Sequence, residues 1–412
     1  MALNVDGIRK DFPILSRKIN GNPLVYFDNA ASTLKPVQVI ESISRFYGMH
    51  YANVHRGVHT LSQEASDMYE EARATIRKFI SARSDREIIF TMNATEALNA
   101  IAYGICQRYV GRGDEIILTV MEHHSNMLPW IRYAREREAR IKYVDIKENG
   151  VLKYDMLNDL ISERTRVIAL THVSNVLGTI NDISYVVKLA REVDAFVVVD
   201  GAQSVPHMPI NVYSLDIDFL AFSGHKMLGP TGIGVLWGRE DILSEMPPFK
   251  LGGGIVKEVA LDKVKLEDLP LKMEAGTPNI AGAIGLAEAA KYLMNIGMEN
   301  VIEHEKQLVK YTLRLMHDEL EDYIEIYGPL DPEIRSGIVT FNLKGVNPHA
   351  VGAILDSYGI AVRTGMHCAH PLHQKLNLKG TVRASYYIYN TSEEIEYMVN
   401  TLKEIVKEVS HT

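Results

Sequence analysis

Two short apolar runs with polar ends decide the fold: AFVVVDGAQ at residues 195–203 and DFLAFSGHK at residues 218–226. Each is rich in the β-branched and aromatic side chains that favour strands. Similar runs recur along the chain and alternate with amphipathic stretches such as TEALNAIAYGICQRYV (95–110) and DISYVVKLAREV (182–193). This alternation predicts an α/β fold in which helices cover both faces of a mostly parallel sheet.

The alternating pattern ends near residue 290, and a different arrangement follows it. Two long helical patterns occupy residues 281–297 and 301–321, and shorter strand patterns precede a final helix at 392–410. We therefore predict a large domain over residues 21–290. Residues 1–20 and 291–412 are predicted to form a smaller α+β domain together.

The composition excludes several classes of protein. The 412 residues hold 44 Lys and Arg against 52 Asp and Glu, a formal net charge of −8, which argues against a nucleic-acid-binding protein. No apolar run approaches the ~18 residues of a membrane span, and MALNVDGIRKDF lacks the apolar core of a secretory signal. With only two cysteines, Cys106 and Cys368, a disulfide framework is excluded and a cytoplasmic location is expected.

The two deciding runs end in side chains that could carry chemistry. Ligands of open parallel sheets bind at the carboxyl ends of strands, so Lys226 is positioned to form a Schiff base. SGHK alone is equally compatible with a surface lysine in a polar turn. A buried Asp200 needs a partner such as the protonated pyridine nitrogen of pyridoxal phosphate (PLP), and Gln203 could donate to the phenolic oxygen. The alternative is that Asp200 caps the next helix.

Two further stretches follow predicted strands. Thr95 lies in NATE (93–96) at the start of a helical run, where a helix N-terminus can hold an anion or simply carry an N-cap. Ser223 and His225 could add donors for a phosphate. His123, in MEHHSN (121–126), could stack on an aromatic ring and exchange protons near pH 7, or be a hydrogen-bonded loop residue.

Taken together and in order, nine stretches resemble the class V, fold-type I PLP enzymes, and within them the Suf-type (group II) cysteine desulfurases. The resemblance covers nearly the whole chain. The stretches are YFDNAAST (26–33), VHRGVHTLS (54–62), MEHHSNMLPW (121–130), THVSNVLGT (171–179), VDGAQSVPH (199–207), FSGHKMLGPTGIGVLWG (222–238), EAGTPN (274–279), YGIAVRTGMHCAHPL (358–372) and RASYYIYNTSEEI (383–395).

The resemblance implies a large domain with a mainly parallel seven-stranded sheet, and it implies roles for the cofactor site. Lys226 would be the Schiff-base lysine, and Asp200 and Gln203 would contact the pyridine nitrogen and the phenolic oxygen. His123 would stack on the ring and handle protons. The phosphate would be held by Thr95, Ser223 and His225, with Thr277 reaching the phosphate of the other subunit of a homodimer.

The same resemblance implies a substrate and a reaction. Asn175, Arg363 and Arg383 would surround L-cysteine, with Arg383 clamping its carboxylate. Cys368 would take the sulfur as a persulfide, L-alanine would leave, and a protein acceptor would carry the sulfur to iron–sulfur cluster assembly. Selenocysteine lyase and cysteine-sulfinate lyase remain alternatives on the same framework. An aminotransferase needs no cysteine in this loop.

Three positions depart from the family's common pattern: Met366, His370 and Ala94. The first two flank the cysteine loop, and we expect Ala94 to leave its backbone N–H available to the phosphate. A rival hypothesis comes from the same loop, where His367, Cys368, His370 and His373 could bind a metal in a hydrolase or a scaffold. The adjacent His367 and Cys368 make that spacing poor for one tetrahedral site, and no metal is expected.

Overall fold

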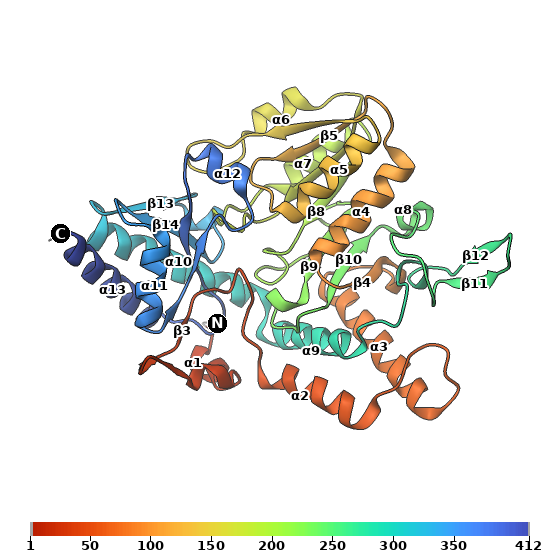
Figure 1. The fold of residues 1–412 in the computed structure, drawn as a ribbon, viewed down its shortest axis with the longest axis horizontal. Helices are drawn as coiled ribbons and strands as arrows, with labels where there is room; N and C mark the ends of the chain where they lie inside the picture. Colours follow the sequence, from red (N-terminus) through yellow and green to blue (C-terminus); the bar gives the residue numbers. More distant parts are fainter. Residues whose placement is uncertain (1–2, 411–412) are drawn as a thin grey trace.

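A computed structural model describes residues 3–410. Its central feature is a seven-stranded sheet in the order β4-β10-β9-β8-β7-β5-β6, in which β10 alone runs in the direction opposite to the other six strands. The predicted mainly parallel sheet is confirmed (Figure 1). In sheet order the strands are β4 (Ile88–Thr91), β10 (Gly234–Gly238), β9 (Phe219–Ser223), β8 (Phe196–Asp200), β7 (Thr165–Thr171), β5 (Glu115–Thr119) and β6 (Arg140–Val144).

Two separate apolar cores lie on the two faces of this sheet. Successive residues of one strand point to opposite faces, so Ile116 joins one core and Ile117 the other. The core that contains Ile116 also holds apolar residues of α4 (Ala94–Tyr109) and α5 (Leu128–Glu136). The opposite core holds residues of α3 (Thr60–Phe79), α7 (Ile183–Arg191) and α9 (Ile280–Ile296). Helices therefore cover both faces, as the alternating pattern predicts.

A second, four-stranded antiparallel sheet has its own core. Its order is β13-β14-β17-β16, with β13 (Ile324–Tyr327), β14 (Ile338–Leu343), β17 (Thr381–Ser385) and β16 (Arg363–Gly365). Buried residues of α10 (Met298–Leu320), α11 (Pro348–Ser357) and α13 (Ser392–Ser410) join this core. A segment near the N-terminus also joins this part of the fold, because β3 (Val25–Tyr26) pairs in parallel with β15 (Ile360–Ala361).

The remaining elements are short. A hairpin of β11 (Val256–Val259) and β12 (Val264–Leu266) projects from the body of the molecule in Figure 1. The others are α1 (Val5–Arg9), α2 (Val37–Arg45), α6 (Tyr154–Leu160), α8 (Glu240–Glu245), α12 (His370–Lys375), β1 (Lys18–Ile19) and β2 (Asn22–Pro23). Among the helices of residues 3–410, none combines the length and the apolar character that crossing a membrane requires. The boundaries at residues 20/21 and 290/291 stay predictions.

Candidate active site

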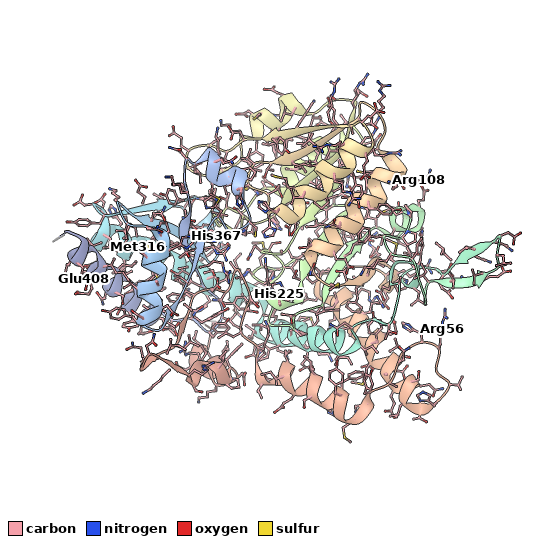
Figure 2. All side chains as sticks on the ribbon, in the orientation of Figure 1. Arg56, Arg108, His225, Met316, His367 and Glu408 are labelled. Carbon is pink, nitrogen blue, oxygen red and sulfur yellow. The ribbon has the colours of Figure 1, made fainter. Side chains whose placement is uncertain are left out.

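A cavity of about 410 Å³ lies where β8, β9 and the start of α4 meet the loop that carries Cys368. Figure 2 labels two of its lining residues, His225 and His367, in the middle of the molecule. Eleven of the twelve predicted site residues line this one cavity: Thr95, His123, Asn175, Asp200, Gln203, Ser223, His225, Lys226, Arg363, Cys368 and Arg383. Thr277 does not.

Asp200 is the last residue of β8, and its side chain is buried. Its Oδ1 accepts a hydrogen bond from the Ala202 N–H at 3.0 Å. Within residues 3–410 it forms no ion pair with a Lys, Arg or His side chain at 4.0 Å or less. Burial raises the pKa of this carboxyl, with the Ala202 N–H and Lys226 opposing the shift. A buried carboxylate in this state suits a ligand that brings a proton-bearing ring nitrogen.

Lys226 follows β9 in the single turn η5 (Gly224–Lys226). Burial lowers the pKa of its amine to about 8, although Asp200 acts in the opposite direction. A lysine with such a pKa supplies a substantial fraction of neutral amine near neutral pH, which is the form that attacks a carbonyl or takes a proton. Gln203 lines the same cavity, where its Nε2 donates to Ala30 O at 2.7 Å and its buried Oε1 has no hydrogen-bond partner.

His123 caps η4 (His124–Asn126), and its Nδ1 accepts from the Ser125 N–H at 3.1 Å. That bond leaves the ring proton on Nε2. Burial and the nearby Lys226 lower the pKa of His123 to about 3, which favours the neutral imidazole at pH 7. Its role in proton transfer stays a prediction. Ser125 also links His123 to the helix start, because its Oγ lies 3.0 Å from His123 Nδ1 and 2.7 Å from Thr95 Oγ1.

The start of α4 forms an anion cradle, with one change from expectation. The Ala94 N–H is not available, because it donates to Ser223 Oγ at 2.8 Å. The bond leaves the Ser223 hydroxyl proton free to donate to a phosphate. The first residue of β10, Gly234, packs against this helix start. Only glycine fits there, because a Cβ would lie 2.5 Å from Asn93 Cα. His225 is the third residue predicted to hold the phosphate. Burial lowers its pKa to about 4, so the imidazole is neutral at pH 7.

Arg383 on β17 is 2% exposed and faces the cavity from the second sheet. Its Nη1 donates to Asn175 O at 2.7 Å, while its buried Nε has no hydrogen-bond partner. Such an orphaned guanidinium N–H suits a carboxylate ligand. Arg363, on the neighbouring β16, donates a hydrogen bond from Nη2 to Asp28 Oδ2 at 2.7 Å.

Cys368 is exposed and lines the same cavity, whereas Cys106 is buried and burial raises the pKa of its thiol to about 12. His367 and Cys368 both adopt the left-handed region, with φ of 48° and 57°. Hydrogen bonds hold both carbonyls: Asn175 Nδ2 donates to His367 O at 2.8 Å, and the His124 N–H donates to Cys368 O at 2.9 Å. Both donors follow strands of the seven-stranded sheet, β7 and β5, so this sheet's loops hold the segment that carries the thiol.

The histidines near Cys368 do not converge on one point. The Nε2 atoms of His367 and His373 both contact Thr381 Oγ1, whereas His370 contacts His124. Across residues 3–410 no three His, Cys, Asp or Glu side chains are grouped to hold a metal ion. The geometry does not support the metal hypothesis.

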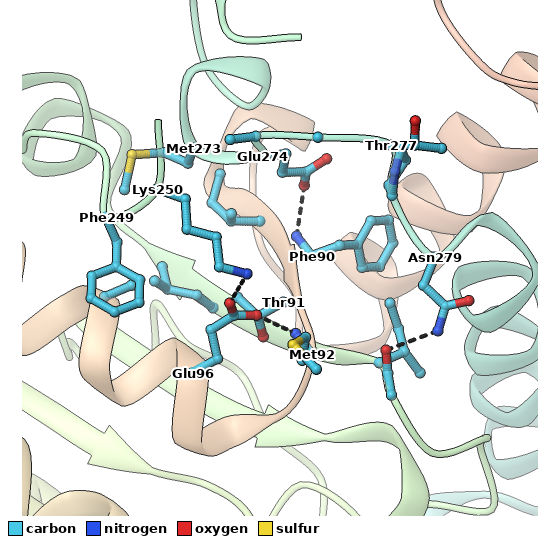
Figure 3. Close-up of a pocket in the computed structure, with 18 of the residues that line it drawn as sticks. Phe90, Thr91, Met92, Glu96, Phe249, Lys250, Met273, Glu274, Thr277 and Asn279 are labelled. Carbon is cyan, nitrogen blue, oxygen red and sulfur yellow. Dashed lines mark hydrogen bonds and ion pairs between the residues drawn. The ribbon is translucent and has the colours of Figure 1, made fainter. Parts of the chain in front are cut away.

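Thr277 lines a second, smaller cavity of about 140 Å³. Figure 3 shows it on the same side of the pocket as Asn279, next to Phe90. Glu274 anchors this loop: it accepts from the Phe90 N–H, and Arg73 Nη1 donates to it at 2.7 Å. Glu96 forms an ion pair with Lys250 in the same cavity. This set lies apart from the cavity that contains Lys226.

Three contributors to the site are absent from the sequence prediction. Asp28 and Ser125 lie inside quoted stretches, yet nothing in a single sequence shows which partners they meet. Glu122 is fully buried and accepts from Thr119, Asn126 and the Thr171 N–H, which ties the ends of β5 and β7 to the turn that carries His123. Its pKa is raised by burial to about 8.

Comparison with known proteins agrees with this geometry. The family model for aminotransferase class-V matches residues 25–398. The chain belongs to the class-V aminotransferase family. Members of this family are PLP-dependent, and PLP is the cofactor of this chain.

Relatives define the branch of the family. A probable cysteine desulfurase of Halalkalibacterium halodurans is 46% identical over 99% of this chain and all of its own length. The cysteine desulfurase of Haloferax volcanii is 45% identical over 97% of this chain and 96% of its own. The solved cysteine desulfurase of Thermococcus onnurineus is 43% identical, with a TM-score of 0.93 and 99% of both chains covered. Within the class-V family, this chain is therefore a cysteine desulfurase.

Proposed function

We propose that this class-V enzyme takes the sulfur of L-cysteine onto Cys368 as a persulfide and releases L-alanine. One observation carries the proposal: Lys226, Arg383 and the exposed thiol of Cys368 line the same cavity. The first is the amine that a PLP enzyme needs, the second is a buried carboxylate partner, and the third is a nucleophile open to an incoming acceptor.

The residues around the cavity fit PLP. Lys226 would hold it covalently, Asp200 would face the ring nitrogen and Gln203 the phenolic oxygen, and His123 would lie against the ring. Thr95, Ser223 and His225 would hold the phosphate at the start of α4. When bound, PLP supplies an electron sink for charge that develops at the substrate Cα. Gln203 Nε2 donates one N–H to Ala30 O and keeps the second for the phenolic oxygen, and the buried Asp200 carboxylate has no ion-pair partner among residues 3–410; both observations support this assignment.

The side chains then divide the work on the substrate. Arg383 would bind the carboxylate through its free Nε, and Asn175, whose carbonyl holds Arg383, would orient the same end. Lys226, as a neutral amine, would take the Cα proton. The Cys368 thiolate would attack the substrate sulfur: the S–S bond forms as the Cβ–S bond breaks, and the carbon fragment leaves as alanine after protonation.

A homodimer is the assembly we propose. Large apolar side chains are exposed on α2, the segment that follows it and the β11–β12 hairpin, among them Ile40, Tyr47, Met49, Tyr51, Leu261 and Val264. Where exposed apolar side chains gather into a contiguous patch, they mark an interaction site. Thr277 lies away from its own chain's cavity, which supports a role at the partner's phosphate. Sedimentation of the holoenzyme at micromolar concentration tests the dimer, and a monomer would refute it.

Delivery is the last part of the proposal. A persulfide on an exposed cysteine can pass to a protein acceptor, and we infer a cytoplasmic acceptor of iron–sulfur cluster assembly, as in Suf-type (group II) enzymes. The short segment between Gly365 and α12 that carries Cys368 supports that subtype.

The direct test is a single turnover of the PLP-loaded enzyme with L-cysteine and no reductant. Mass spectrometry of the peptide that contains Cys368 is expected to show a gain of one sulfur atom, with one alanine released per site. Alanine without a modified Cys368 would refute the proposal. Selenocysteine and cysteine sulfinate in parallel reactions show whether either is the better substrate.

A further inference from the structure

One contact joins the Cys368 segment to the large domain through two histidines. His370 Nδ1 lies 3.1 Å from His124 Nε2, and the two rings are 4.8 Å apart with an interplanar angle of 30°. The His370 backbone N–H also points to the same Nε2, at 3.4 Å. His124 in addition holds Cys368 directly, because its own backbone N–H donates to Cys368 O at 2.9 Å.

The backbone contact fixes the direction of the side-chain bond. A backbone N–H is always a donor, so His124 Nε2 must be the acceptor for both contacts. His370 then donates from Nδ1, and His124 is neutral with its proton on Nδ1. Burial and the neighbouring His370 lower the pKa of His124, which favours this neutral form.

The segment needs such support. His367 and Cys368 hold consecutive left-handed conformations without being glycine, and a residue of that kind persists only where its surroundings impose the conformation. Asn175 fixes the carbonyl on one side of the thiol and His124 the carbonyl on the other. His370 begins α12 two residues after Cys368, so its bond to His124 fixes the far end of the same segment.

We infer that His124 and His370 form a clasp that positions Cys368 for attack on the substrate sulfur. Neither side chain lines the cavity, so they are positioning residues and not catalytic ones. The inference rests on the proposed role of Cys368. It also gives a purpose to the histidine at 370, one of the positions where this chain departs from the common pattern.

Three variants test the clasp in the PLP-loaded enzyme. His370→Phe keeps a flat ring but removes the Nδ1 donor, His370→Asn keeps an amide N–H near that position, and His124→Phe removes the acceptor. His317→Phe, at an exposed histidine of α10, is the matched control. The readouts are the single-turnover rate of persulfide formation on Cys368 and the visible absorbance of the cofactor, which a defect confined to the clasp leaves unchanged.

His370→Phe and His124→Phe are each expected to slow persulfide formation about tenfold or more, as small displacements of a reacting group do. His370→Asn should restore the rate to within about twofold of the parent. The double variant should lose no more than either single variant, because both remove the same contact. Parent-like rates in both single variants, or additive losses in the double variant, would overturn the clasp.

The outcome also separates the clasp from the proposed function. Should Cys368→Ala release alanine from L-cysteine at the parent rate, the role of Cys368 itself fails. Should that variant be inactive while His370→Phe and His124→Phe match the parent, only the clasp fails. A variant that loses the cofactor absorbance is judged by His370→Asn and by the remaining single variant, whose rates decide the question in the same way.

Discussion

Arg363 and Arg383 lie directly opposite each other on the antiparallel strands β16 and β17. Like charges in this position repel, and a nearby carboxylate offsets the repulsion. Asp28 provides it: both its oxygens accept from Arg363, at 2.7 to 3.1 Å, and its Oδ1 lies 3.6 Å from Arg383 Nη2. Asp28 thereby holds one arginine and leaves the Nε of the other free for substrate.

Replacing Asp28 by Asn is expected to disturb both arginines. Without the carboxylate, the two guanidinium groups repel and the substrate-binding N–H loses its position. We expect the KM for L-cysteine to rise about tenfold, the loss typical of a charged hydrogen bond, with a smaller change in kcat. Steady-state alanine production measures both, with the exposed Asp67→Asn as control. An unchanged KM would show that Asp28 does not organise the substrate site.

Lys226→Ala is expected to abolish turnover and the visible absorbance of bound PLP while the chain stays folded. The covalent link depends on this one amine, whereas folding depends on the large cores on either side of the sheet. Visible absorbance reports the loss of bound PLP, and far-ultraviolet circular dichroism on the same sample reports whether the chain stays folded. Turnover at the parent rate would remove Lys226 from the mechanism.

Asp200→Ala should reduce turnover far more than Asn175→Ala. In the proposed site the buried carboxylate would support the proton on the cofactor ring, and its loss would weaken the electron sink for every substrate. Asn175 holds Arg383 and the His367 carbonyl, so its loss affects orientation. The comparison is kcat for L-cysteine at saturating PLP, and equal or reversed losses would contradict the role given to Asp200.

Sequence predicted the fold and the strand-end groups well, because those signals are local. Asp200 and Lys226 each follow a buried apolar strand, and parallel strands bring their carboxyl ends to one edge. Contacts between distant segments could not be predicted. Asp28 meets Arg363 across 335 positions of sequence, and His124 meets His370 across 246.

Hydrogen-bond partners and burial also depend on the folded structure. From the sequence, the Ala94 N–H is expected to be free, because a sequence does not show that Ser223 reaches it. The burial of His123 beside Lys226, which lowers the pKa of the imidazole, is likewise visible only in three dimensions. The role proposed for Thr277 requires a second subunit, so it stays a prediction.

The pKa of Lys226 makes a prediction about stability in the cofactor-free protein. The folded chain releases this proton near pH 8, whereas an unfolded chain keeps it to about pH 10.4. Between these values the unfolded state binds more protons, so the contribution of Lys226 to the free energy of unfolding rises with pH.

Lys226→Met removes the titrating group and keeps the length of the side chain. We expect this variant to be the more stable protein at pH 7, with its advantage shrinking by about 1 to 3 kcal/mol by pH 10. Urea denaturation of both cofactor-free proteins at the two pH values measures the difference between their free energies of unfolding. Titrating groups that the two proteins share contribute equally to both and drop out of this difference. A difference that does not change with pH would mean that Lys226 is not desolvated.

The measurement that bears most directly on the central claim uses Cys368→Ala. In the proposed site PLP is held by Lys226 and Asp200, which this substitution does not touch, so the variant should keep the parent's visible absorbance and still bind L-cysteine. Cys106 cannot replace the missing thiol, because it is buried and its pKa is raised. The decisive quantity is alanine released per site from L-cysteine in a single turnover. The account predicts a loss of at least about a hundredfold, a conservative lower bound because removing a catalytic nucleophile can cost far more; alanine release at the parent rate would contradict it.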